Sequence, residues 1–280
     1  MITGQHDIDS TWVSIVQKQG ASVLPRLQFD WSHWTQQDFN VFFGGGFSDK
    51  IHQPLIDSII KLVQERSFDG LVIEWGFLDT ENILPVMKPM LTALFQELRL
   101  NTKSRQLFLV IPPFRGDPNQ QSFTSQHYSQ LLDVVDRFCV MTYDASGGRP
   151  SPNAPLKDFV IPTIDYFTKG TDQDLKASKL LLGLNFYGYK YSLSSQPNMD
   201  VVLGHDYKSI MSKHSPQLHW DENSAENFFD YTNEEGVQAR VFYPSVRSIM
   251  ARTKVATDRN LAGVMIWEVG QGLTEFVDLL

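Results

Sequence analysis

Cysteine is almost absent from this chain, and the features that depend on it are absent too. Cys139 is the single cysteine among 280 residues, so no disulfide can form within the chain. It lies in the apolar run RFCVMTYD (137–144), where a free thiol behaves as a small buried hydrophobe. No Asn-x-Ser/Thr glycosylation site is present either. These features leave the cellular compartment open.

Positive charge and long apolar runs are also scarce. The chain has 24 Lys and Arg against 32 Asp and Glu, a net charge of -8. This balance offers no basic surface, so we expect neither nucleic acid nor an anionic membrane as a partner. No apolar run approaches the roughly 18 residues that span a bilayer, so we expect no membrane insertion. Residues 1–20 lack the basic start and apolar core of a signal peptide.

Motifs for cofactors and metals are missing as well. The stretch FFGGGF (42–47) precedes a helical pattern, but no strand leads tightly into it and it lacks G-x-G-x-x-G spacing. Nucleotide binding is therefore disfavoured. The chain has no H-x-x-H, no C-x-x-C and no clustered acidic ligands. We expect no cofactor and no metal ion.

What the chain does contain is a regular alternation of strands and helices. Short apolar segments predict strands near 22–29, 70–75, 106–113, 137–144, 179–188 and 263–270. Apolar residues at helical spacing predict amphipathic helices between them. One such stripe consists of Ile51, Leu55, Ile56, Ile59, Ile60 and Val63. This β-then-α order indicates a parallel α/β sheet, either closed as a (β/α)8 barrel or open and doubly wound.

One segment interrupts the alternation. Residues 189–243 are rich in Ser, Asn, His and aromatics and are too many for an ordinary loop. We expect a small α+β insertion before the last strand. It would lie within a single barrel domain that covers residues 1–280.

The segment SFDGLVIEWGF (67–77) contains a predicted buried strand with a glutamate, Glu74, at its carboxyl end. Leu71, Val72 and Ile73 are apolar on both faces, as in a parallel sheet with both sides covered. Glu74 and Trp75 follow at the carboxyl end, where α/β proteins place ligand-binding groups. Glu74 is therefore a candidate site residue.

Four strand-end motifs together resemble those of the family 18 glycoside hydrolases. FDGLVIEWG (68–76) resembles the fourth-strand signature D-G-x-D-x-D-x-E, and MTYD (141–144) resembles the sixth-strand M-x-Y-D. GLNFYG (183–188) is similar to the seventh-strand G-x-P-x-Y-G, and GVMIWEVG (263–270) to the eighth strand with its tryptophan. The resemblance implies a (β/α)8 TIM-type barrel in which strands three to eight are recognised. Asn185 stands where the family has proline.

In that family the reaction is substrate-assisted, and one carboxylic acid is essential. The substrate's N-acetyl oxygen attacks the anomeric carbon, while the last Glu of the fourth-strand motif protonates the leaving oxygen. Val72, Glu74 and Gly76 occupy the three acidic positions here. Glu74 lies about 6.6 Å short of the last position on a straight strand, whereas a general acid acts within about 3 Å. We therefore expect no catalytic residue and a non-catalytic branch of the family.

The resemblance also implies which residues bind sugar. The predicted ligand-binding residues are Glu74, Tyr143, Asp144, Tyr187 and Trp267. Trp267 would form a platform under a sugar ring, although a strand tryptophan is more often core. Tyr143 and Asp144 offer a hydroxyl and a carboxylate for an acetamido group or for sugar hydroxyls, and Asp144 equally fits an Asx turn that caps the following loop. The expected partner is a chitooligosaccharide or a related N-acetylated oligosaccharide, which the protein would bind without hydrolysis.

Two other interpretations stay open. One is a weak or atypical glycosidase that uses Glu74 or Asp144. The other is a protein-interaction module with a vestigial pocket, carried by the scavenger-type receptor that the resemblance implies. Glu74 itself fits a hydrogen-bonded interior carboxylate, a ligand contact or a displaced acid.

The motifs label the strands three to eight, so the family's first two strands have no counterpart before MITGQHD. We expect further coding sequence upstream that carries a signal peptide. The resemblance then implies a secreted or lysosomal full-length protein.

Overall fold

The computed structural model describes residues 8–76, 80–100, 104–194 and 198–279. The chain forms two compact units. The first unit comprises Met1–Ile111 and Gln126–Phe138, and the second comprises Pro112–Ser125 and Cys139–Leu280. Across the described residues, no helix is both long enough and apolar enough to cross a membrane.

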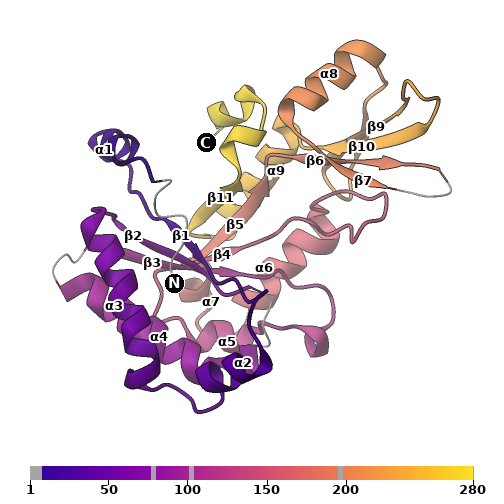
Figure 1. Cartoon of the computed structure of the whole chain (residues 1–280). Coiled ribbons are helices and arrows are strands. Elements are labelled where there is room, and N and C mark those ends of the chain that lie inside the picture. The colour runs from indigo at the N-terminus through magenta and orange to yellow at the C-terminus, as the bar shows by residue number, and fades with distance from the viewer. Residues whose placement is uncertain (1–7, 77–79, 101–103, 195–197, 280) are drawn as a thin grey trace. The chain divides into compact units, whose positions relative to one another are not determined.

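The first unit is built on three parallel strands. Strands β1 (Arg26–Gln28), β2 (Gly70–Glu74) and β3 (Gln106–Ile111) pair in the order β1-β2-β3. The helices of this unit are α1 (Ser10–Lys18), α2 (Gln36–Phe43), α3 (Asp49–Glu65), α4 (Thr80–Leu100) and α5 (Ser125–Gln130), the last beginning at the unit boundary. Figure 1 shows α3 and α4 side by side in this unit. The predicted apolar stripe of α3 is confirmed at Ile56, Ile59, Ile60 and Val63, which are all buried. At the start of the helix Leu55 is only partly buried and Ile51 is 38% exposed.

The second unit contains the next parallel strands and their helices. Strand β4 (Arg137–Val140) crosses the unit boundary, and β5 (Leu180–Asn185) pairs in parallel with β11 (Gly263–Trp267). The helices are η3 (Leu156–Val160), α6 (Ile161–Thr168), α7 (Gln173–Ala177) and α9 (Val246–Asp258), with short 3-10 turns η2 (Pro118–Gln120), η4 (Val269–Gln271) and η5 (Thr274–Leu279). Each of the six predicted strand segments thus contains a strand.

The predicted α+β insertion is confirmed within the second unit. Its antiparallel sheet has the order β7-β6-β10-β9-β8. The strands are β6 (Gly188–Ser192), β7 (Met199–Val202), β8 (His219–Asp221), β9 (Glu226–Thr232) and β10 (Gln238–Tyr243). Helix α8 (Gly204–His214) packs on one face through Tyr207, Ile210 and Met211, which contact a buried cluster that includes Phe229 and Val241 (Figure 1).

Strand β6 gives this sheet two chemically different faces. Tyr189 and Tyr191 point to one face, where they form a buried cluster with Phe242. Lys190 and Ser192 alternate with them and therefore belong to the face that carries α8. The face with the tyrosines contacts a predicted site residue, because Tyr189 donates a hydrogen bond to Asp144.

Candidate functional site

Asp144, which is partly buried, lies at the centre of a polar cluster with two buried tyrosines in the second unit. Strand β4 ends at Val140, and Asp144 follows four residues later with a left-handed φ of 60°. Its carboxylate oxygen Oδ1 accepts hydrogen bonds from the hydroxyls of Tyr187, at 2.6 Å, and Tyr189, at 2.7 Å. Hydrogen bonds to an ionised carboxylate are stronger than neutral ones. This cluster therefore holds a carboxylate in a fixed direction.

The two tyrosines stay protonated, as donors must. Burial raises the pKa of Tyr187 far above its ordinary value, and the hydrogen bond to Asp144 adds to the effect. Burial and the same carboxylate also raise the pKa of Tyr189. Tyr143 is buried and meets the Tyr187 ring edge to face, with centroids 6.3 Å apart. The structure thus brings together three predicted residues, Tyr143, Asp144 and Tyr187.

Trp267 is the last residue of β11 and is 36% exposed. In the parallel register it lies opposite Asn185, and its carbonyl accepts the N–H of Phe186 at 2.9 Å. Asn185 donates from its side chain to the carbonyl of Tyr187 at 2.8 Å. Asn185, which stands where the family motif has proline, therefore helps to fix the turn that carries Tyr187.

Glu74, the remaining predicted residue, belongs to the first unit. It is the last residue of β2, and its side chain is 12% exposed. Its oxygen Oε2 accepts a hydrogen bond from the guanidinium of Arg26 at 3.0 Å. Its other oxygen, Oε1, has no partner among the residues that the structure describes. Arg26 thus holds one oxygen of Glu74 in place.

Gly76 ends the strand run that the family motif describes. Its φ is 76°, a left-handed value that side chains rarely adopt. A Cβ at this position would lie 3.4 Å from Trp31 Nε1, and that indole donates a hydrogen bond to the carbonyl of Trp75. Trp75 itself is buried and stacks on Phe29 with ring centroids 4.3 Å apart. The backbone therefore turns away from the strand direction at Gly76.

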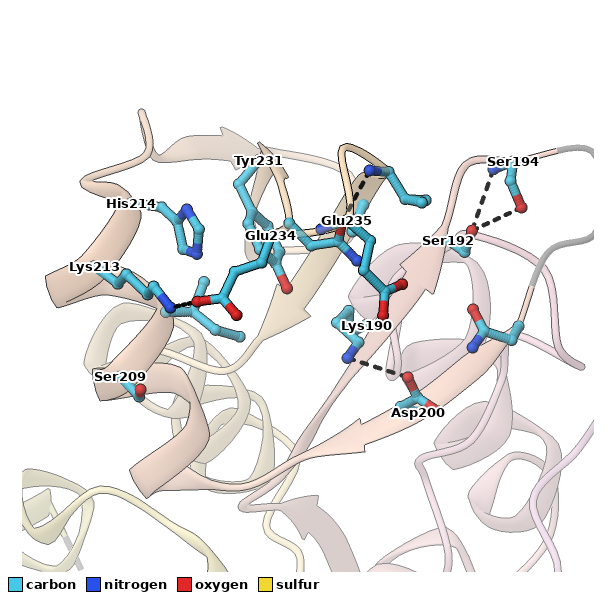
Figure 2. Close-up of a pocket in the computed structure, with 15 residues that line it drawn as sticks. Lys190, Ser192, Ser194, Asp200, Ser209, Lys213, His214, Tyr231, Glu234 and Glu235 are labelled. Atoms are coloured by element: carbon cyan, nitrogen blue, oxygen red, sulfur yellow. Dashed lines mark hydrogen bonds and ion pairs between the residues drawn. The ribbon is translucent and has the colours of Figure 1, made fainter.

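A cavity lies in the insertion, on the sheet face that carries α8. It has a volume of about 670 Å³, and Figure 2 shows side chains of α8, β6 and the β9–β10 hairpin around it. Lys190 pairs with Asp200 at 3.1 Å, and Lys213 pairs with Glu234. None of the predicted site residues lines this cavity. Its charged side chains largely neutralise one another.

Possible metal ligands were compared across the part of the chain that the structure describes. There, no three His, Cys, Asp or Glu side chains are grouped to hold an ion. Cys139 is buried, and burial raises the pKa of its thiol to about 12. It therefore remains a neutral thiol at physiological pH.

Sequence reasoning missed the residues that support Asp144. Asn153 accepts the backbone N–H of Asp144 on its side-chain oxygen at 2.6 Å. Behind it, Glu226 and Arg252 form an ion pair at 2.9 Å with both side chains 3% exposed. An acidic residue opening an alternating strand and a basic residue on an amphipathic helix both look like surface residues. No local sequence pattern predicts that Glu226 and Arg252 form an ion pair.

Comparison with known proteins supplies the family. The profile of glycosyl hydrolases family 18 matches residues 34–272. A cortical fragment-lytic enzyme of Bacillus subtilis is 24% identical over 249 residues, which cover 80% of this chain and 54% of that protein. The chain thus spans about half the length of this curated relative.

Solved structures agree on the fold. The Bacillus megaterium spore cortex-lytic enzyme SleL superposes with a TM-score of 0.80 at 18% identity, covering 96% of this chain and 61% of that chain. A chitinase from Chromobacterium violaceum gives a TM-score of 0.78 at 16% identity, covering 96% and 82%. The predicted TIM-barrel-type α/β fold, with its parallel strands and antiparallel insertion, is confirmed.

These relatives correct two expectations. The expectation of a chain without hydrolytic activity is wrong, because the similar proteins bear the names of lytic enzymes and chitinases. They are bacterial sporulation enzymes and chitinases, not members of a non-catalytic branch. The physical error lies in the use made of Gly76. Glycine there shows only that this position supplies no proton.

Proposed function

Since the chain belongs to family 18 of the glycosyl hydrolases, we propose that it hydrolyses an N-acetylated glycan of the chitin or cortical peptidoglycan type. The names of its relatives, a cortical fragment-lytic enzyme and a chitinase, support this substrate class. The observation that carries the proposal is the Asp144 carboxylate, held by two tyrosine hydroxyls after β4. Such an acceptor suits the N–H of an acetamido group.

In the proposed reaction the substrate supplies its own nucleophile. The acetamido oxygen attacks the anomeric carbon and closes a ring with it, while the bond to the leaving oxygen breaks and that oxygen takes a proton from a carboxylic acid. Water then attacks the anomeric carbon of this cyclic intermediate, opens the ring and returns a proton to the carboxylate. Asp144 would hold the acetamido N–H, which aligns the acetamido oxygen for attack.

We assign the proton transfer to Glu74. Asp144 is the poorer candidate, because one of its oxygens already accepts two hydroxyl hydrogen bonds. Glu74 is the last carboxylate of the motif strand and keeps one oxygen without a described partner. The distance of about 6.6 Å that argued against it assumed a straight strand through position 76. Because the backbone turns at Gly76, that distance does not apply.

The direct test is cleavage of defined glycans. The chain is incubated with a chitooligosaccharide and with cortical peptidoglycan fragments, and products are identified by mass spectrometry. We expect shorter oligosaccharides from at least one substrate. If neither substrate is cleaved at high enzyme concentration, while a bacterial chitinase cleaves the first under the same conditions, the proposed hydrolysis is wrong.

Trp267 gives a separate prediction about binding. If its half-exposed ring stacks on a sugar, Trp267→Ala should weaken chitooligosaccharide binding by about 1 to 3 kcal/mol, the scale for a large apolar side chain. Calorimetric titration measures the affinity, and Trp12→Ala on α1, where the indole is 56% exposed, is the matched control. A lower melting temperature with unchanged affinity would instead make Trp267 a core residue.

Two further features stay predictions of the sequence. They are a scavenger-type receptor partner and a secreted or lysosomal location. Pull-down with the receptor tests the first, and microscopy of the tagged protein in cells tests the second.

A further inference from the structure

The second unit contains a buried ion pair that takes no direct part in the proposed reaction. Glu226 opens β9, Arg252 lies on α9, and both side chains are 3% exposed. Burial raises the pKa of Glu226, and the Arg252 guanidinium together with two backbone amides opposes that rise. Removing two charges from water costs free energy, so we looked for what the two side chains hold in place.

The pair fixes one short segment of backbone. The Glu226 carboxylate accepts the N–H of Asn153 at 3.0 Å and that of Ala154 at 2.8 Å. Arg252 donates to the carbonyl of Ala154 as well. Its other bonds go to the carbonyls of Ser224, Ala225 and Ser248. Both ends of the ion pair therefore meet at residues 153 and 154.

That segment in turn holds Asp144. The side-chain oxygen of Asn153 accepts the N–H of Asp144 at 2.6 Å, and its carbonyl accepts the N–H of Ala145 at 2.9 Å. Asn153 is 1% exposed, so water does not compete for these bonds. Asp144 has a φ of 60°, which non-glycine residues seldom adopt without local support. The two bonds from Asn153 provide that support.

We propose that Asn153, fixed by the buried Glu226–Arg252 pair, is the positioning residue that aims the Asp144 carboxylate at the glycan. The proposal rests on the proposed function for the part that concerns the glycan. Asn153 acts through Asp144, and its side chain also lies close enough to the Tyr187 hydroxyl to affect the pKa of that group, so the Tyr189 signal is the cleaner reporter of Asp144. Glu226 and Arg252, which lie 72 to 98 positions along the chain from the residues that they hold, thereby set the direction of one carboxylate. The conformation that they hold is the one in which Asp144 meets Tyr187 and Tyr189.

The test detects the position of the Asp144 carboxylate by the proton NMR signals of the two tyrosine hydroxyls that donate to it. Hydroxyl protons in short bonds to a carboxylate give low-field proton NMR signals, which Tyr187→Phe and Tyr189→Phe assign. Asn153→Leu keeps the side-chain size and removes the acceptor. We expect it to shift or abolish both signals in the folded protein, while Ser151→Ala in the same loop leaves them unchanged. A purely structural role would lower the melting temperature and leave both signals in place, which overturns the proposal.

Kinetics and exchange complete the test. With a cleavable chitooligosaccharide, Asn153→Leu should raise KM and lower kcat together, as Asp144→Asn does, and reduce kcat/KM about tenfold, the scale of one lost hydrogen bond. If the unaltered protein cleaves nothing, the proposed function fails, but the hydroxyl signals still decide the positioning. Should the variant not fold, amide exchange in the unaltered protein decides. An Asp144 amide that exchanges as fast as exposed loop amides would overturn the proposal.

Discussion

Replacing Glu74 by glutamine should lower the rate of glycan hydrolysis by about 10²- to 10⁴-fold, the usual contribution of a general acid. The substitution keeps the size of the side chain and its acceptor oxygen for Arg26, but it removes the only proton that Glu74 can give. The acetamido nucleophile belongs to the sugar and is unaffected. We therefore expect kcat to fall while chitooligosaccharide affinity changes little. Initial rates and calorimetric titration measure the two quantities.

The control is Glu65→Gln at the end of α3, where the carboxylate is 61% exposed and pairs with Lys61. It should leave the rate unchanged. Asp144→Asn provides the contrast, because loss of an acetamido-binding acceptor should raise KM as well as lower kcat. If Glu74→Gln retains the full rate and Asp144→Asn abolishes it, Asp144 is the acid. If both variants retain the rate, the proton comes from a residue not assigned here.

The fold was readable from the sequence because its strands are covered on both sides. Segments such as Leu71 to Ile73 are apolar throughout, and the helices between strands keep one apolar stripe, as in α3. The insertion was recognisable from its polar, aromatic composition. Its strand order β7-β6-β10-β9-β8 could not be predicted from the sequence. Packing across the whole sheet, and not a local pattern, decides which antiparallel strands pair.

The site was readable only where a motif carried it. Tyr143, Asp144 and Tyr187 came from strand-end motifs, and the structure brings them together. Tyr189 donates to the same carboxylate, but it lies one residue beyond its motif. Its role follows from the alternation of β6, whose starting point at Gly188 the sequence did not define.

The error over catalysis has a similar origin. Positions 72, 74 and 76 were placed on one straight strand, although β2 ends at Glu74 and Gly76 adopts a left-handed φ. A glycine in a strand motif often marks a departure from the strand. The spacing of carboxylates along a sequence therefore indicates distance only as far as the strand continues.

The second large effect concerns stability. Arg252→Ala should lower the free energy of unfolding by about 3 to 5 kcal/mol near neutral pH, because it leaves the Glu226 carboxylate buried without its counter-charge. Urea unfolding followed by circular dichroism measures the change. Lys254→Ala on the same helix is the control. Its ion pair with Asp258 is exposed, so the variant should change stability by at most about 0.5 kcal/mol.

The loss in Arg252→Ala should depend on pH in a defined direction. Burial already holds the pKa of Glu226 above its ordinary value of 4.5, and removal of Arg252 raises it further. A folded-state pKa above the unfolded value means that folding is favoured while the group is protonated and loses that advantage as pH rises. The variant should therefore be closest to the parent below pH 4.5 and fall further behind as pH rises toward 7. A deficit that is constant over this range would show that Arg252 stabilises the fold through its backbone hydrogen bonds and not through its charge.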